Sequence, residues 1–94
     1  MNTTSVRESR REERRPAEGS VRVRYTNPRQ VQIEGKLVDL SAGGFRMRHK
    51  WTALSAGQIV EFSHAEATGQ ARVVWNRVAG DHVETGFLVV ETGK

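Results

Sequence analysis

Two short clusters in the sequence carry side chains that could bind an anionic ligand, and the first is a run of arginines. Its spacing gives two overlapping R-x-x-x-R pairs, Arg10 with Arg14 and Arg11 with Arg15. In an extended or turn-like segment, arginines at this spacing can hold an anion from two sides, and their planar forks suit phosphate oxygens and guanine edges. The alternative is a solvated charge run in which the intervening glutamates pair with the arginines on a helix.

The second cluster has the pattern D-x-S-x-x-G and contains Asp39, Ser41, Gly43 and Gly44. Side chains two residues apart on an extended chain point to the same side, which places Asp39 beside Ser41. A carboxylate next to a hydroxyl can accept hydrogen bonds from the N–H edge of a guanine. The paired glycines permit a close backbone approach to a ligand. The alternative is that Asp39 and Ser41 bond to their own turn, with Gly44 in the left-handed conformation.

Length and composition limit the other kinds of chemistry. The chain has 94 residues, enough for one small domain, and it has no cysteine, which excludes disulfides and zinc–thiolate sites. The three histidines fall in separate segments and Ser41 has no histidine nearby, so we expect no metal site, no cofactor and no enzymatic activity. No apolar run approaches the ~20 residues of a membrane span, and we expect a cytoplasmic domain.

Positive charge is concentrated at the start of the chain. Residues 1–30 hold eight arginines and four acidic residues, whereas residues 31–94 hold seven basic and seven acidic residues. This bias favours an anionic partner for the N-terminal segment. Because the charges of the remainder cancel, we expect no basic stripe across it, which counts against nucleic-acid binding.

The elements that must position these residues are strands. Residues 1–19 carry almost no apolar side chain and predict a flexible basic arm, whereas residues 20–92 predict a folded domain. Apolar residues recur there with period two, interrupted by turn signals. The predicted strands cover about residues 21–25, 31–37, 45–49, 60–62, 71–75 and 83–90. A sheet this short is best stabilised by closure, so we predict an all-β, six-stranded antiparallel barrel with little or no C-terminal helix.

Details of this pattern give further expectations. Gly35 falls inside the second strand, where a bend or bulge is expected. Residues 51–57 predict a loop or a single helical turn. His49 and Trp75 fall on the apolar parity of their strands, and both are therefore expected to pack inside the barrel.

Taken together and in this order, the two clusters resemble the PilZ family, the bacterial receptor domains for cyclic di-GMP. The first cluster also matches the R-R-x-x-R-x-P form of the family motif at Arg10, Arg11, Arg14 and Pro16. Residues 71–75 and the pair Gly86–Phe87 look like the closing strands of the family, so the resemblance covers about residues 7–90. The sequence departs from the family pattern in the acidic pair inside the arginine motif and in the missing C-terminal helix.

The resemblance implies a six-stranded barrel that binds cyclic di-GMP without catalysis. Arg10 and Arg14 would contact phosphates or guanine, with Arg11 and Arg15 as secondary candidates. Asp39 and Ser41 would read a guanine edge, and Gly44 with Gly43 would admit the ligand to the backbone. Ligand binding would order residues 7–16, and the domain would then signal to a protein partner in trans. The alternatives are a small basic barrel that binds single-stranded nucleic acid and a PilZ-like adaptor that binds no nucleotide.

Overall fold

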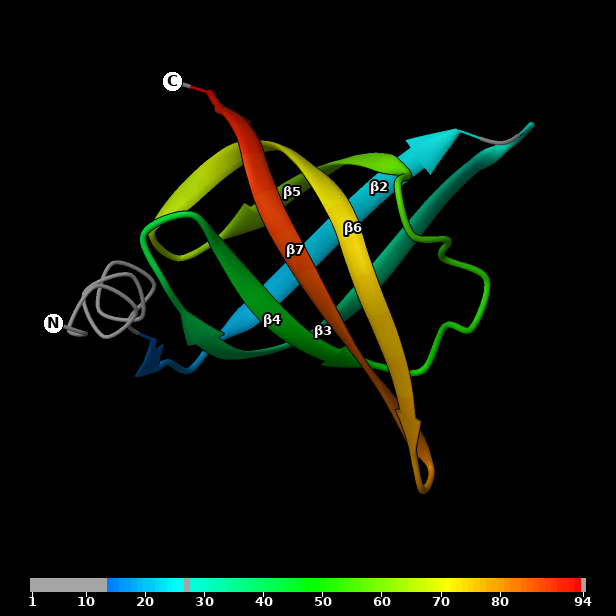
Figure 1. Cartoon of the computed structure of the whole chain (residues 1–94). Coiled ribbons are helices and arrows are strands. Elements are labelled where there is room, and N and C mark those ends of the chain that lie inside the picture. Colours follow the sequence, from blue (N-terminus) through cyan, green and yellow to red (C-terminus); the bar gives the residue numbers. More distant parts are fainter. Residues whose placement is uncertain (1–13, 27, 94) are drawn as a thin grey trace, which may run out of the picture.

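The chain folds into a closed antiparallel β-barrel (Figure 1). A computed structural model describes residues 14–26 and 28–93, and this part of the chain contains no helix. The strands are β1 (Arg15–Pro16), β2 (Ser20–Thr26), β3 (Gln30–Leu40), β4 (Gly44–His49), β5 (Ile59–His64), β6 (Ala67–Ala79) and β7 (His82–Thr92). Six of them form a ring in the order β3-β2-β5-β6-β7-β4, which the pairing of β3 with β4 closes. No helix in these residues is long and apolar enough to cross a membrane.

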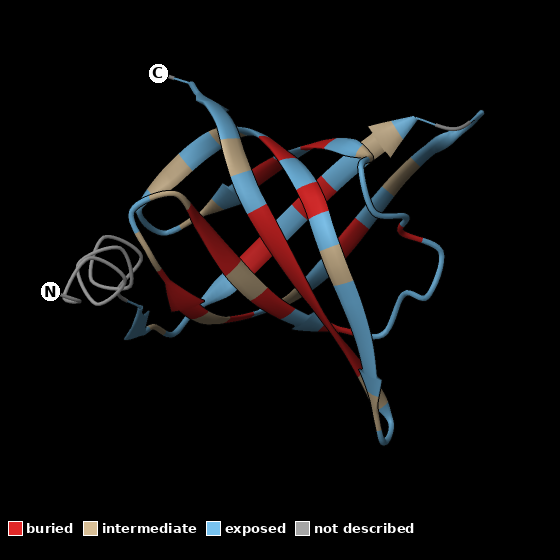
Figure 2. Ribbon diagram, in the orientation of Figure 1, coloured by how far each residue is buried: buried red, intermediate tan, exposed pale blue. Residues whose placement is uncertain are grey.

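The barrel confirms the fold predicted from the two-residue period. In β2, Val21 and Val23 are fully buried, while Arg22 and Arg24, which alternate with them, are exposed. Buried positions line the inside of every strand of the ring (Figure 2). At the centre Phe45 stacks on Phe87 with 4.7 Å between ring centroids, and Phe62 lies 4.9 Å from Phe45 on another side. Residues 51–57 form the predicted loop.

The remaining strand, β1, lies outside the ring; it is short and continues the direction of β2 along β3. The two strands pair with the same edge of β3, Pro16 opposite Asp39 and Ser20 opposite Lys36. Gly19 lies between them with a φ of 119°, a left-handed conformation that favours glycine. This strand lies in the segment predicted to be an arm; residues 1–13 of that segment lie outside the described residues.

Two of the three register shifts in the described sheet change the face of the barrel on which Asp39 and Trp75 lie. In β3 the register shifts between Leu37 and Asp39, so the expectation of a bulge at Gly35 was wrong and the extra residue is Val38. In β6 the register shifts between Val73 and Trp75. Each insertion reverses the alternation of inward and outward side chains. Asp39 therefore lies on the outer face of the barrel, and so does Trp75, which we had expected inside.

A buried chain of hydrogen bonds ties the 51–57 loop to the barrel. The backbone N–H of Trp51 donates to Nδ1 of His49 at 3.0 Å, so the ring proton is on Nε2, which donates to Oγ1 of Thr85 at 2.7 Å. The Thr85 hydroxyl donates to Oδ1 of Asn76 at 2.7 Å, and the Asn76 amide donates to the Leu54 carbonyl at 3.0 Å. The chain requires a neutral His49, which is buried as expected.

The free energy of unfolding should therefore fall as the pH is lowered from 7.5 to 5.5. Burial lowers the pKa of His49 below its usual value near 6.5. The imidazole of the unfolded chain then binds a proton more readily than the buried His49 ring. The stability contributed by neutral His49 is therefore fully present above pH ~6.5 and is lost as the pH falls through the pKa of the folded state. Urea unfolding of His49→Gln should show a smaller loss over this range than the wild type. An unchanged dependence in folded His49→Gln would contradict the argument.

Candidate functional site

The second cluster lies on the outer face of the barrel in a row that crosses four strands. The strand registers place Asp39 of β3 opposite Arg46 of β4, Arg46 opposite Gly86 of β7, and Gly86 opposite Trp75 of β6. Cross-strand partners project to the same side of a sheet. The two bulges thus bring a carboxylate, a guanidinium and an indole onto one surface, separated by a residue with no side chain.

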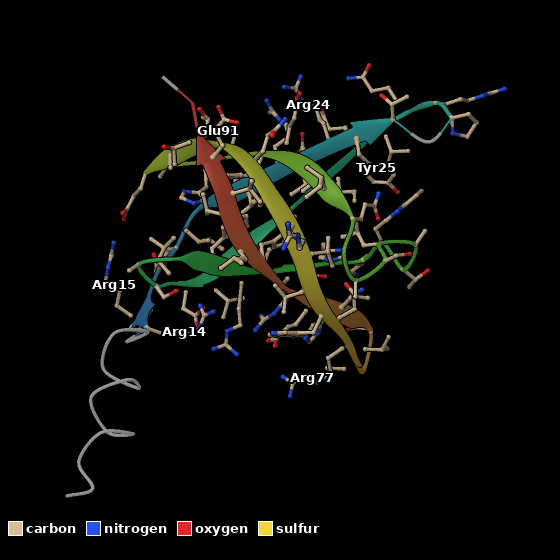
Figure 3. The ribbon with its side chains drawn as sticks, turned by 45° about the horizontal axis from the view of Figure 1, so that its top comes forward. Arg14, Arg15, Arg24, Tyr25, Arg77 and Glu91 are labelled. Carbon is tan, nitrogen blue, oxygen red and sulfur yellow. The ribbon has the colours of Figure 1, made fainter. Side chains whose placement is uncertain are left out.

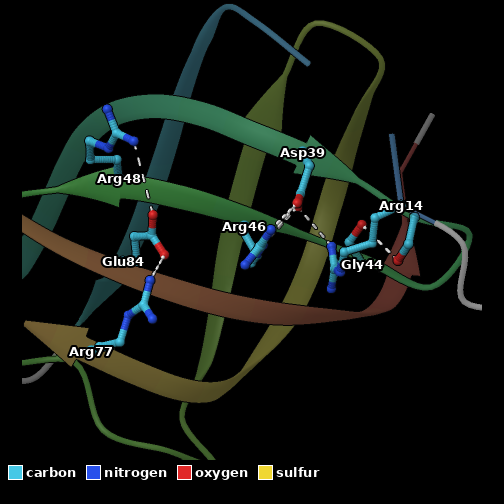
Figure 4. Close-up of polar contacts among 8 residues, drawn as sticks. Arg14, Asp39, Gly44, Arg46, Arg48, Arg77 and Glu84 are labelled. Atoms are coloured by element: carbon cyan, nitrogen blue, oxygen red, sulfur yellow. Dashed lines mark hydrogen bonds and ion pairs between the residues drawn. The ribbon is translucent and has the colours of Figure 1, made fainter. Parts of the chain in front are cut away.

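Asp39 is the centre of an arginine cluster (Figure 4). Nη1 of Arg14 donates to one carboxylate oxygen at 2.9 Å, and Nε of Arg46 lies 3.0 and 2.9 Å from the two oxygens. A third bond runs from Nη2 of Arg46 to the same carboxylate. The Asp39 side chain is only 8 % exposed, whereas those of Arg14 and Arg46 are 35 % and 32 % exposed. The acid therefore lies beneath the two guanidinium groups, which reach the surface.

The charges of this cluster fix its protonation. Burial raises the pKa of the Asp39 carboxyl, but the hydrogen bond from Arg46 and the charges of Arg14 and Arg46 outweigh it, so the pKa of Asp39 lies below its usual range. The hydrogen bond to Asp39 likewise raises the pKa of Arg46. The cluster holds one negative and two positive charges at neutral pH, which gives a net positive site.

The Ser41–Gly44 turn is held by its own backbone. The Ser41 N–H donates to the Gly44 carbonyl at 2.9 Å, and the Ser41 hydroxyl lies 3.5 Å from the same oxygen. Among the described residues, Gly44 is not one of the glycines with positive φ, so the left-handed alternative for Gly44 was wrong. Glycine is needed there because a Cβ would lie 2.0 Å from the Phe87 carbonyl oxygen. The absence of a side chain at Gly44 lets β4 and β7 approach closely.

A cavity of about 180 Å³ joins the two predicted clusters. Its walls come from Arg14 just before β1, the Ser41–Gly44 turn, β6 and β7. They are formed by Arg14, Ser41, Gly43, Gly44, Val74, Trp75, Gly86, Phe87 and Leu88. Residues far apart in the sequence therefore meet at one hollow, and the Arg14–Asp39 ion pair lies at its edge.

Among the described residues of the first cluster, Arg15 is not part of this cavity. Arg15 projects to the opposite side of β1 (Figure 3), where its guanidinium lies 2.8 Å from the exposed Glu66 carboxylate. Arg10 and Arg11 lie outside the described residues. Of the two described arginines in this cluster, Arg14 therefore lines the cavity and Arg15 does not.

Sequence reasoning missed two residues of the site, Trp75 and Arg46. A Cβ on Gly86 would lie 2.4 Å from Nε1 of Trp75, so the indole packs against that glycine, and both residues line the cavity. The glycine was visible in the sequence, but its pairing with Trp75 depends on the β6 bulge. Arg46 follows the D-x-S-x-x-G pattern by two residues, and only the β3 bulge places it beside Asp39.

A larger hollow of about 640 Å³ lies over β2, β5 and the 51–57 loop. Tyr25, Gln30, Gln58 and Gln70 are among its lining residues, and these do not include any predicted site residue that the structure describes. It carries one acidic residue, Glu61, which is paired with Arg24 at 3.1 Å. The smaller cavity therefore remains the candidate site for an anionic ligand.

Comparison with known proteins places this geometry in a family. The chain matches the family model described as PilZ domain over residues 8–92, a span that includes both clusters and all seven strands. No curated protein matches the chain significantly. The family match agrees with the six-stranded ring and with the convergence of the arginine and D-x-S-x-x-G clusters on one cavity. This chain belongs to the PilZ domain family.

Proposed function

We propose that the protein is a non-enzymatic receptor module for cyclic di-GMP in the bacterial cytoplasm. The observation that carries this proposal is the cavity at which Arg14, the Ser41–Gly44 turn and Trp75 meet. It combines cationic forks, a polar turn and an aromatic face. A dinucleotide with two phosphodiester charges and two purine rings offers complementary groups.

The cavity and its edge would bind different parts of the ligand. At about 180 Å³ it is smaller than the 300–1,000 Å³ typical of small-molecule sites, so it would take one guanine, with the phosphates along its rim. Trp75 would stack on that base, and Arg14 and Arg46 would contact phosphate oxygens or a guanine edge. Arg10 would complete the first pair.

Asp39 has two possible actions in this scheme. It can accept hydrogen bonds from a guanine edge, and it holds the guanidinium groups of Arg14 and Arg46 in place. Since both arginines already bond to its carboxylate, a guanine would have to share or replace one of those contacts. Ser41 and the backbone of Gly43 offer further polar contacts from the turn.

The signal would pass through the N-terminal segment. Ordering a segment costs about 1–2 kcal/mol per residue in backbone entropy, which several arginine contacts would have to offset. We propose that ligand binding orders residues 7–16 and thereby alters contact with a protein partner in trans.

Calorimetric titration with cyclic di-GMP, cyclic di-AMP, GTP and a short oligonucleotide tests the proposal. We expect saturable binding of cyclic di-GMP alone at physiological salt, with favourable enthalpy offset by unfavourable entropy from ordering. Tighter binding of the oligonucleotide would favour the nucleic-acid alternative. No binding of any of the four would favour an adaptor that uses the fold without a nucleotide.

A further inference from the structure

A second arginine–carboxylate–arginine group lies on the same outer face of the barrel (Figure 4). The Glu84 carboxylate of β7 accepts a 2.9 Å hydrogen bond from Nη2 of Arg77 on β6 and lies 4.0 Å from Nη2 of Arg48 on β4. Its side chain is 10 % exposed, whereas those of Arg48 and Arg77 are 50 % and 65 % exposed. The acid is again beneath and the guanidinium groups are outside.

This group belongs to a cationic row across the sheet. The registers align Lys36 of β3 with Arg48 of β4, Arg48 with Glu84, and Glu84 with Arg77. The expectation that no basic stripe crosses the barrel was therefore wrong. Equal numbers of acids and bases in residues 31–94 did not reveal it, because the neutralising carboxylate is buried while the cations reach solvent.

A cleft of about 620 Å³ opens beside the row, between β3, β4 and the β6–β7 turn. Its walls contain three cations and two carboxylates, together with two histidines and a glycine. The lining residues are Glu34, Gly35, Lys36, Arg48, His49, Lys50, Asp81 and His82. Arg48 belongs both to this cleft and to the Glu84 group, so the two features form one continuous surface, here called the Arg48 surface.

We propose that the Arg48 surface, formed by Lys36, Arg48, Lys50 and Arg77 around Glu84, docks an acidic segment of a partner protein. The buried Glu84 holds the guanidinium of Arg77 at a fixed place before a partner arrives, so less conformational freedom is lost on binding. Arginine forks pair with carboxylates in the parallel two-bond geometry that gives specificity.

The mixed charge of the cleft favours a protein over a polynucleotide. Glu34 and Asp81 line the same walls as the three cations. A nucleic-acid backbone repeats its negative charge at every nucleotide and would be repelled by both carboxylates. A peptide can place glutamates against the cations and a lysine against the acids, which is the usual way that charged interfaces select their partners.

The Arg48 surface is separate from the cavity lined by Arg14, since the two share no lining residue. The docking proposal therefore stands on its own observations. Only the further step, that the module signals in trans through the Arg48 surface, rests on the proposed function.

Fluorescence anisotropy with two labelled probes tests the docking surface. The probes are an eight-residue peptide with three glutamates and one lysine, and an eight-nucleotide thymidylate, each measured at 0.05 and 0.15 M salt. The variants are Arg48→Gln with Arg77→Gln, and Lys36→Gln with Lys50→Gln, which leaves Glu84 paired. The matched control is Arg24→Gln with Arg29→Gln, two exposed arginines on β2 and just before β3 that do not line the cleft.

We expect the wild type to bind the peptide more tightly than the thymidylate. The first variant should lower peptide affinity at least fivefold, the second at least threefold, and the control less than twofold, with cyclic di-GMP binding retained in all three. An equal loss in the control would show that net charge alone drives binding and would overturn the proposal. Tighter binding of the thymidylate, or no peptide binding by the wild type, would overturn it as well.

Discussion

Replacing Arg14 with alanine is expected to weaken cyclic di-GMP binding by about 2 kcal/mol, which is roughly 30-fold. Arg14 lines the cavity, and its guanidinium is held by the Asp39 carboxylate at 2.9 Å. The substitution would remove the proposed charge-assisted contact to the ligand, and it removes a partner that helps to keep Asp39 ionised. Titration calorimetry at fixed salt measures the loss.

Arg15→Ala is the matched control for this result. Arg15 is the next residue, carries the same charge and pairs with Glu66 away from the cavity. An exposed ion pair of this kind contributes little, so this variant should bind within about threefold of the wild type. Wild-type affinity in Arg14→Ala would show that the arginine pair is misassigned. An equal loss in both variants would show that the ligand responds only to net charge.

Asp39→Ala is expected to weaken cyclic di-GMP binding by about 1–3 kcal/mol, although it removes a negative charge from an anion site. If the site only attracted phosphate, this loss of repulsion would tighten binding. The carboxylate instead holds Arg14 and Arg46 and, in the proposed function, offers an acceptor to guanine, so the variant would lose both actions. Calorimetry at two salt concentrations separates this effect from the general field.

Cyclic di-IMP, which lacks the guanine amino group, distinguishes the two actions of Asp39. If the carboxylate accepts from that amino group, the wild type should prefer cyclic di-GMP and Asp39→Ala should lose the preference. If Asp39 acts only through its arginines, both ligands should weaken equally in the variant. Tighter binding of cyclic di-GMP by a folded Asp39→Ala would exclude both actions and leave a simple phosphate site.

The strands and most of the core could be predicted because they depend on local alternation. Val21, Val23 and Phe45 are buried as the two-residue period requires, and a closed ring follows from six short strands that would otherwise leave open edges. The candidate site residues were also found from local motifs. Arg14, Ser41, Gly43 and Gly44 line one cavity, and their contact with a ligand stays a prediction.

The remainder could not be predicted because it depends on register, which is set between strands. Val38 and Val74 are ordinary valines in apolar strands, and nothing in their neighbourhood marks them as bulges. Each changes the face on which the following residues lie. For this reason the sequence pattern predicted Trp75 in the core and did not reveal Arg46 beside Asp39. The cationic row through Glu84 was not predicted, because acidic and basic residues are equally numerous in residues 31–94.

The bulges in β3 and β6 have a consequence for reading relatives of this chain. A relative could keep every letter of D-x-S-x-x-G and still lose the site if it lacked one residue between the positions of Leu37 and Asp39, since its carboxylate would then turn into the barrel. A one-residue gap at Val74 would do the same to the indole. Among aligned sequences, the number of residues between the core positions and these two side chains should therefore separate nucleotide binders from non-binders better than the motif itself.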